Sequence, residues 1–214
     1  MLFDKKWQLK SNLKFDFINE KFKSIERIQN IEFNRDWNIE TSSGNQKLIS
    51  SALEFSNKKN NTINYLFENL EFSDSFTGNK HHIFGNLKLK NISINFNNSI
   101  LNNKTSFEKG TFSRYYISSK YNLTKSWYGI ALYGENNKRT EISTDLPLAV
   151  SHKFNEIEAF FGVGDSTNVY TQFGANFRTT DSIQNTSFEQ VNNSKTFYIK
   201  STLLNTNTAN LKAY

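Results

Sequence analysis

The sequence has no cysteine, one proline and one methionine in 214 residues. Without cysteine, disulfide scaffolds, cysteine-ligated metal centres and thiol nucleophiles are excluded. Apolar runs are also short, and none approaches the roughly 18 residues that a membrane-spanning helix needs. Alanine and methionine, which favour helices, are scarce, so the composition gives little support to a helical fold.

Aromatic residues are abundant, with 20 Phe, 9 Tyr and 3 Trp making 15% of the chain. They occur with many Asn, Ser and Thr residues, which favours β structure and argues against a disordered chain. The formal net charge is +6, but the basic residues are scattered, and pairs such as Lys5-Lys6 are the longest clusters. A nucleic-acid groove needs a basic stripe with aromatic residues on one face. We therefore expect solvated charges and no nucleic-acid partner.

Alternating polarity predicts long two-faced strands in the second half of the chain. Over residues 112–123 one parity carries Tyr115, Ile117 and Tyr121, and the other carries polar residues such as Arg114. Similar alternation over 127–135, 152–164 and 168–178 predicts sequential antiparallel neighbours joined by tight turns. We expect Ile157, Ala159, Phe161 and Val163 to share a face with Val169, Thr171, Phe173 and Phe177.

Two polar stretches, residues 136–150 and 179–195, are predicted to be long loops because their alternation is weak. The first half is less regular. It predicts strands over 7–18, 48–56, 63–73, 81–89 and 91–97, and isoleucines three residues apart predict a helix over 20–30. Small residues on the predicted strands fit curved walls where side-chain volume is restricted; these are Gly129, Ala131, Gly162, Gly164, Gly174 and Ala175.

These patterns predict an all-β fold, an antiparallel meander of long hairpins that forms part of an outer-membrane β-barrel or a large open curved sheet. Strands of 9–11 tilted residues with one apolar face are what a barrel wall requires, although a soluble sheet that covers a core on one face alternates in the same way. We expect residues 1–214 to form one continuous β segment, with a weak internal division near 97–110.

The first seven residues, Met1 to Trp7, lack the basic and apolar regions of a secretory signal peptide. The chain begins and ends inside β pattern, so we expect it to be a fragment of a longer protein. Its export signal would then lie in an upstream portion, and the expected location is the outer membrane or the cell surface.

Two segments resemble large, β-rich, uncharacterised outer-membrane or surface proteins of Bacteroidota. The first is Ile28-Gln-Asn-Ile-Glu-Phe-Asn-Arg-Asp-Trp-Asn38, and the second is Gly164-Asp-Ser-Thr-Asn-Val-Tyr170, followed by Phe177-Arg178 and Asp181-Ser182. The resemblance extends from about Phe15 to the C-terminus. It implies a place in the outer envelope and brings no catalytic residues with it.

Histidines and carboxylates are the first candidates for chemistry. His81 and His82 are adjacent, so on a strand they point to opposite faces and cannot share a metal ion; His152 is distant in sequence. The alternative to a metal site is that His81 and His82 are exposed histidines at a strand edge. Glu156 and Glu158 share one strand face about 7 Å apart, near the spacing of an inverting glycosidase, but a polar face is the simpler interpretation.

Four further patterns have structural alternatives. Residues 162–167 (Gly-Val-Gly-Asp-Ser-Thr) lack the spacing of a P-loop or a hydrolase elbow, so a hairpin turn is expected. Arg35 and Asp36 can form an ion pair beside the aromatic ring of Trp37. This group would serve either to bind a ligand or to hold a turn or strand in place. The glycosylation motifs at Asn91 and Asn122 are expected by chance. Exposed aromatic residues predict either sugar stacking or a membrane girdle: Trp7, Trp37, Trp127, Tyr116 and Tyr133.

The leading hypothesis is a non-enzymatic wall segment of an outer-membrane or cell-surface protein. It has no assigned catalytic, cofactor-binding or metal-binding residue. Its partners are outer-membrane lipid or missing strands of the same protein, with a glycan or a surface protein also possible. The alternatives are a secreted β-sandwich that binds glycans through exposed aromatics, and a hydrolase that uses a carboxylate pair.

Overall fold

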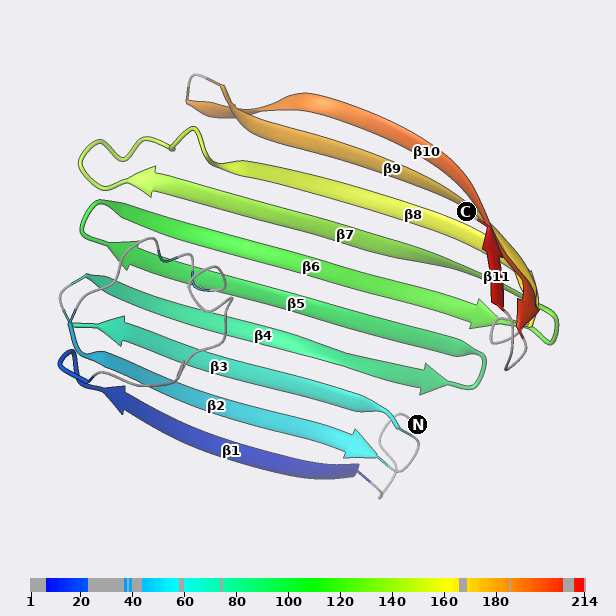
Figure 1. Ribbon diagram of the computed structural model, residues 1–214, viewed down its shortest axis with the longest axis horizontal. Coiled ribbons are helices and arrows are strands. Elements are labelled where there is room, and N and C mark those ends of the chain that lie inside the picture. The colour runs from blue at the N-terminus through cyan, green and yellow to red at the C-terminus, as the bar shows by residue number, and fades with distance from the viewer. Residues whose placement is uncertain are drawn as a thin grey trace.

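The computed structural model describes residues 7–22, 37, 39, 44–57, 60–73, 75–165, 169–184, 186–205 and 210–213. These residues form one antiparallel sheet of 11 strands whose spatial order is their order in the sequence (Figure 1). The predicted all-β meander is confirmed. The strands are β1 (Trp7–Ile18), β2 (Gln46–Asn57), β3 (Thr62–Phe72), β4 (Phe76–Leu89), β5 (Ile92–Thr105), β6 (Glu108–Asn122), β7 (Ser126–Glu141), β8 (His152–Gly164), β9 (Tyr170–Gln184), β10 (Ser187–Asn205) and β11 (Asn210–Ala213).

The four strands predicted most clearly from alternation are confirmed as β6 to β9. Each pairs with the next in antiparallel register. Ile157 lies directly opposite Phe177, and Phe161 lies opposite Phe173, so the predicted shared face of β8 and β9 is also confirmed. Val169 lies just before the start of β9.

Of the two predicted long loops, residues 179–195 are largely strand, whereas residues 136–150 are strand only as far as Glu141. Residues 179–195 belong to β9 and β10, which pair across a short connection after Gln184. The loop predicted at 136–150 begins only after Glu141, because β7 continues to that residue. Both stretches are polar on the two sides of the strand, which removes the alternation on which a strand prediction depends.

The sheet is open in the described part of the chain and does not close into a barrel. β1 pairs with β2 alone, and at the other side the short β11 pairs with the end of β10. β5 and β6 pair along their length through the expected division near 97–110. The predicted helix falls mainly on residues 23–30, outside the described residues. No helix within the described ranges is long and apolar enough to cross a membrane.

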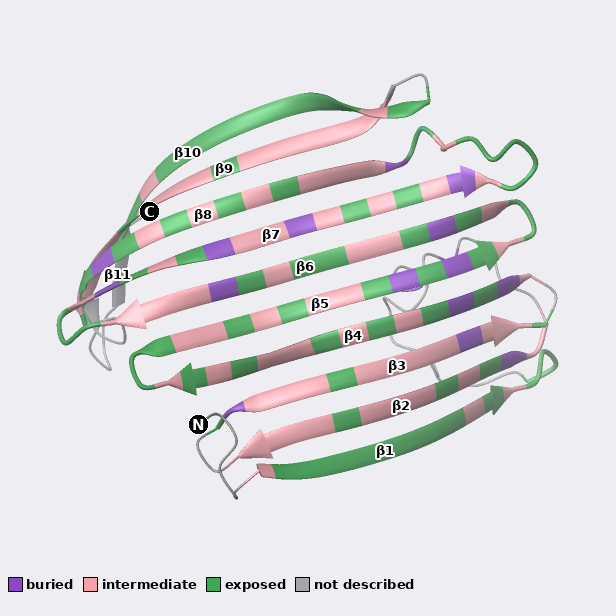
Figure 2. Cartoon of the chain, turned by 180° about the vertical axis from the view of Figure 1, so that it is seen from behind, coloured by how far each residue is buried: buried purple, intermediate pink, exposed green. Residues whose placement is uncertain are grey.

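The main buried cluster lies against one face of the sheet, near the ends of β3, β4 and β5 (Figure 2). Trp37 and Ile39, from the connection between β1 and β2, pack there against the strands. Asn103 donates a hydrogen bond from its side-chain amide to the Trp37 carbonyl, at 3.0 Å. The bond satisfies a backbone acceptor that burial removes from water. The strand residues of the cluster are Leu70, Phe76 and Leu101, with Leu48, Phe72 and Phe112 packed against it.

Candidate functional site: an apolar face and a polar basin

One face of the sheet carries exposed hydrophobic side chains on all strands from β1 to β10. Residues that lie opposite each other in antiparallel strands share a face. The register therefore places Leu132 of β7, Ile157 of β8 and Phe177 of β9 in one row. The most exposed members of this apolar face are Leu9, Leu13, Phe15, Phe17, Ile49, Leu53, Tyr65, Ile83, Ile92, Ile100, Tyr115, Ile117, Tyr128, Ile130, Ile157, Phe161, Val163, Phe173, Phe177, Phe197 and Ile199.

On β6 to β8 the apolar residues form a band that ends before the strands do. On β8 the band runs from Ile157 to Val163, roughly 20 Å at 3.3 Å per residue. Towards the connection between β7 and β8 the same face becomes polar, with Asn136 lying between Ser113 and Lys153 in the register. The band therefore lies towards the end of the sheet that carries the β4–β5, β6–β7 and β8–β9 connections (Figure 1).

Tyrosines lie at both borders of the band. At the polar border, the Tyr65 hydroxyl lies 2.8 Å from His81 Nδ1, and the Tyr115 hydroxyl donates to Asn155 Oδ1 at 2.8 Å. At the other border the rings of Tyr121 and Tyr128 lie 5.4 Å apart. A tyrosine with its ring among apolar groups and its hydroxyl among polar ones suits an interface between hydrocarbon and water.

The opposite face is polar and its side chains are more crowded. Trp127 is 4% exposed and Ala131 is 2% exposed, whereas Tyr128 and Ile130 on the apolar face are 50% and 46% exposed. The described residues place no second sheet over Trp127, so neighbouring side chains of the same face bury it. Side chains converge in this way on the inner side of a curved sheet. Figure 2 shows the alternation of exposed and less exposed positions along β5 to β8.

This placement corrects the expectation for the aromatic residues. Trp37 and Trp127 are buried, so they cannot offer open rings to a sugar. Tyr116 and Tyr133 contact each other on the polar face, with ring centroids 4.8 Å apart, so they do not form a girdle on the apolar face. Trp7 does lie beside the apolar band, where its ring stacks on Phe55 at 4.8 Å.

Several strand glycines make room for these rings. A Cβ atom added to Gly162 would lie 2.2 Å from the Trp127 ring, and one added to Gly174 would lie 2.1 Å from the Tyr198 ring. An aromatic residue that covers a glycine on the next strand fills the space left by the missing side chain. Gly162 and Gly174, two of the small residues expected in a curved wall, are explained here by the bulky rings that they accommodate.

We expect Gly162→Ala to lower the free energy of unfolding by about 1–3 kcal/mol, because the buried Trp127 ring cannot move without repacking. Urea unfolding followed by tryptophan fluorescence would measure the loss. Trp127→Leu should reduce the penalty of Gly162→Ala in a double-mutant cycle. An equal penalty in the Trp127→Leu background would show that the ring is not the cause.

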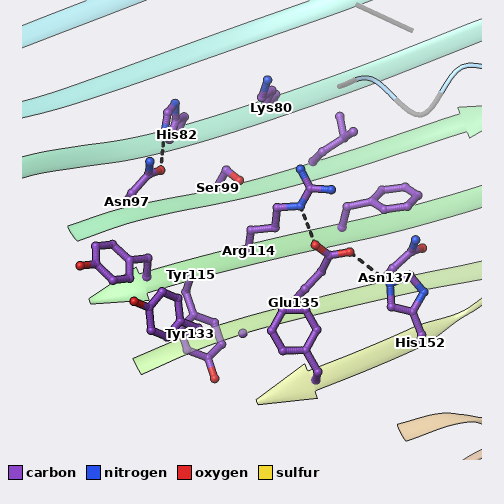
Figure 3. A pocket seen from close by; sticks show the side chains of 15 residues that line it. Lys80, His82, Asn97, Ser99, Arg114, Tyr115, Tyr133, Glu135, Asn137 and His152 are labelled. Carbon is purple, nitrogen blue, oxygen red and sulfur yellow. Dashed lines mark hydrogen bonds and ion pairs between the residues drawn. The ribbon is translucent and has the colours of Figure 1, made fainter. Parts of the chain in front are cut away.

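A polar basin of about 670 Å³ lies on this face between β4 and β8 (Figure 3). At its centre Glu135 accepts a hydrogen bond from Arg114 Nε at 2.8 Å, and its other oxygen lies 3.1 Å from His152 Nε2. On the opposite side His82 Nε2 lies 2.7 Å from Asn97 Oδ1. Five strands thus bring cationic, anionic and amide groups to one water-accessible hollow.

The electrostatics of the basin favour polar ligands without selecting one. The Arg114 side chain is 61% exposed, so its ion pair with Glu135 is screened by water and contributes little to stability. Asn137 Oδ1 is buried and accepts no hydrogen bond from the described residues. Away from the basin, in the loop after β7, a hydrogen bond from the Lys109 side chain holds the pKa of Asp145 below its usual value.

The histidines that the sequence singled out are separated. His81 lies on the apolar face near Tyr65, whereas His82 lies on the polar face, and β4 is an interior strand, so neither is at a sheet edge. His82 and His152 both line the basin. Within the described ranges no three His, Cys, Asp or Glu side chains come close enough to hold a metal ion.

The two glutamates of β8 share the polar face as expected; Glu156 is engaged by the neighbouring β9, and Glu158 by β10, the strand beyond it. Glu156 accepts a hydrogen bond from Asn176 at 2.6 Å and lies 3.6 Å from Arg178. Glu158 accepts a hydrogen bond from the Tyr198 hydroxyl. β8 ends at Gly164, after which the chain turns into the antiparallel β9, as predicted for a hairpin. Arg35, Asp36 and residues 166–168 lie outside the described residues, as does most of the 28–38 segment.

Sequence reasoning missed the basin residues Arg114, Glu135 and Asn137. They are far apart in the sequence, and only the strand register brings them together.

No family model, curated protein or solved structure matches the chain. The fold and the site define a single-layer antiparallel meander with one apolar face and one polar face.

Proposed function

We propose that this chain is a structural wall segment of an outer-membrane or cell-surface protein. Its apolar face contacts lipid, and its polar face lines a water-filled space. The observation that carries the proposal is the continuous band of exposed hydrophobic side chains across strands β1 to β10. The band has polar residues beyond one border and tyrosines at both, as a transmembrane wall requires.

The exposed apolar surface is difficult to explain for a soluble monomer. Soluble proteins rarely expose continuous apolar patches larger than a few hundred Å². Here Leu13, Phe15 and Phe197 are among more than a dozen large side chains that share one uncovered face. In lipid the same face needs no protein cover, and hydrogen bonds between neighbouring strands satisfy the backbone.

The strand edges support the fragment hypothesis within this proposal. β1 has one described neighbour, so the second row of its backbone groups has no partner strand in the described part of the chain. Missing strands of the same protein would satisfy these groups and remove an edge that otherwise promotes aggregation. The resemblance to envelope proteins of Bacteroidota supports the same location.

The soluble glycan-binding sandwich is less well supported. It needs a second sheet on the apolar face and open aromatic rings, but Trp37 and Trp127 are buried on the other face. Glu156 is held by Asn176 of β9, and Glu158 by Tyr198 of β10. The site therefore gives no specific support to hydrolysis.

The proposal is tested by expressing residues 1–214 and comparing sedimentation and thermal unfolding with and without a maltoside detergent. We expect association in plain buffer, because the apolar face and the strand edges are uncovered, and dispersion in detergent. A monodisperse monomer with one cooperative transition in plain buffer would overturn the membrane assignment.

A further inference from the structure

A second hollow, of about 540 Å³, lies on the polar face at the end of the sheet where β4 turns into β5. Lys88, Lys90 and Lys120 line it with Asn, Ser and Thr residues, and no acidic side chain lines it. None of the three lysines forms an ion pair with a described residue. Some other lysines on this face have acidic partners, as Lys10 does with Glu54 at 3.2 Å and Lys80 with Glu68 at 3.8 Å.

The strand register explains how the lysines come together. Lys88 of β4 lies opposite Ser93 of β5, and Ser93 lies opposite Lys120 of β6. Neighbouring strands are about 4.8 Å apart, so the backbones of Lys88 and Lys120 lie roughly 10 Å from each other, on either side of Ser93. Two long cationic side chains and a hydroxyl donor thus surround one point on the face.

Two further features fix the positive charges at this place. The Lys120 ammonium lies 4.7 Å from the centroid of the Trp127 ring, a cation–π contact that anchors one wall of the hollow. Lys90 occupies the turn with φ 48°, a backbone conformation that favours Gly or Asn over a long side chain. A third lysine therefore lies beside the other two, at a turn position where its backbone is strained.

We propose that this lysine pocket, defined as Lys88, Lys90, Ser93, Lys120 and Asn122, binds a soluble ligand that carries phosphate groups. Lysine ammonium groups bind phosphate oxygens by charge-assisted hydrogen bonds, and a ligand with two phosphates can reach more than one lysine. The pocket lies on the face opposite the apolar band, so a free solute reaches it more directly than a lipid headgroup does. The choice of a soluble ligand over a lipid headgroup rests on the proposed function, in which lipid covers the apolar band.

Isothermal titration with inorganic phosphate and with pyrophosphate tests the proposal, using the full chain in a maltoside detergent, which carries no phosphate. Pyrophosphate should bind more tightly than phosphate. In Lys88→Gln/Lys120→Gln the affinity for pyrophosphate should fall by about tenfold or more, because hydrogen bonds to charged groups are each worth roughly a decade in binding. If the chain is monomeric without detergent, the same titration is made in buffer.

The matched control is Lys10→Gln/Lys14→Gln, which removes the same charge from the same face at lysines paired with Glu54 and Asp16. It should leave pyrophosphate affinity unchanged at constant ionic strength. An equal loss in both double variants would reduce the effect to general charge attraction and overturn the proposal. So would no binding at millimolar pyrophosphate, or binding confined to vesicles that contain phosphatidylglycerol.

Discussion

Ile130→Arg should destabilise the chain folded in a lipid bilayer by about 2–4 kcal/mol, the cost of arginine near the middle of a barrel wall. Ile130 lies in the centre of the apolar band on β7 and its side chain is 46% exposed. In water an exposed position tolerates arginine at little cost, usually within about 0.5 kcal/mol. The substitution therefore separates a lipid-facing surface from a water-facing one.

Asn136→Arg is the matched control, because Asn136 lies on the same strand and face but in the polar zone beyond the band. We expect a change of about 1 kcal/mol or less there. Urea unfolding of both variants in phosphatidylcholine vesicles would measure the two values. Equal, small effects at both positions would argue that lipid does not cover the band.

Much of the fold follows from alternation, but only where the two faces meet different surroundings. On β8 and β9, Phe161 and Phe173 face away from the crowded polar side, so the period of two is clear and both strand and register could be predicted. Beyond the band, Asn193 of β10 and Thr179 of β9 face each other where both sides of the sheet are polar. There the two-residue alternation of apolar and polar residues disappears, so the sequence of a strand resembles that of a loop.

The polar basin could not be predicted for a different reason. Arg114 and Glu135 face each other because β6 and β7 adopt one particular register, and His152 joins them only after the loop that follows Glu141. No local pattern marks any of these residues. A sequence signal did exist for one member of the buried cluster, because Leu101 is apolar at a position of β5 whose parity otherwise carries Ser, Asn and Thr residues.

The cluster around Trp37 provides the prediction with the largest expected effect on stability. Leu70 is fully buried, at 0% exposed, and packs with Trp37, Phe76 and Leu101. Leu70→Ala should lower the free energy of unfolding by about 2–5 kcal/mol, from the lost transfer energy and the cavity left behind. Urea unfolding in the medium in which the chain folds would measure it.

Leu66→Ala is the matched control, because Leu66 is on the same strand and the same face but is only half-buried and lies outside the cluster. It should cost about 1 kcal/mol, since less apolar surface is buried there. The double variant Leu70→Ala/Trp37→Ala should lose less free energy of unfolding than the two single variants lose together. Each single variant already removes the packing between the two side chains, so the double variant cannot lose it twice. A strictly additive pair would mean that the Trp37 and Leu70 side chains do not stabilise each other directly.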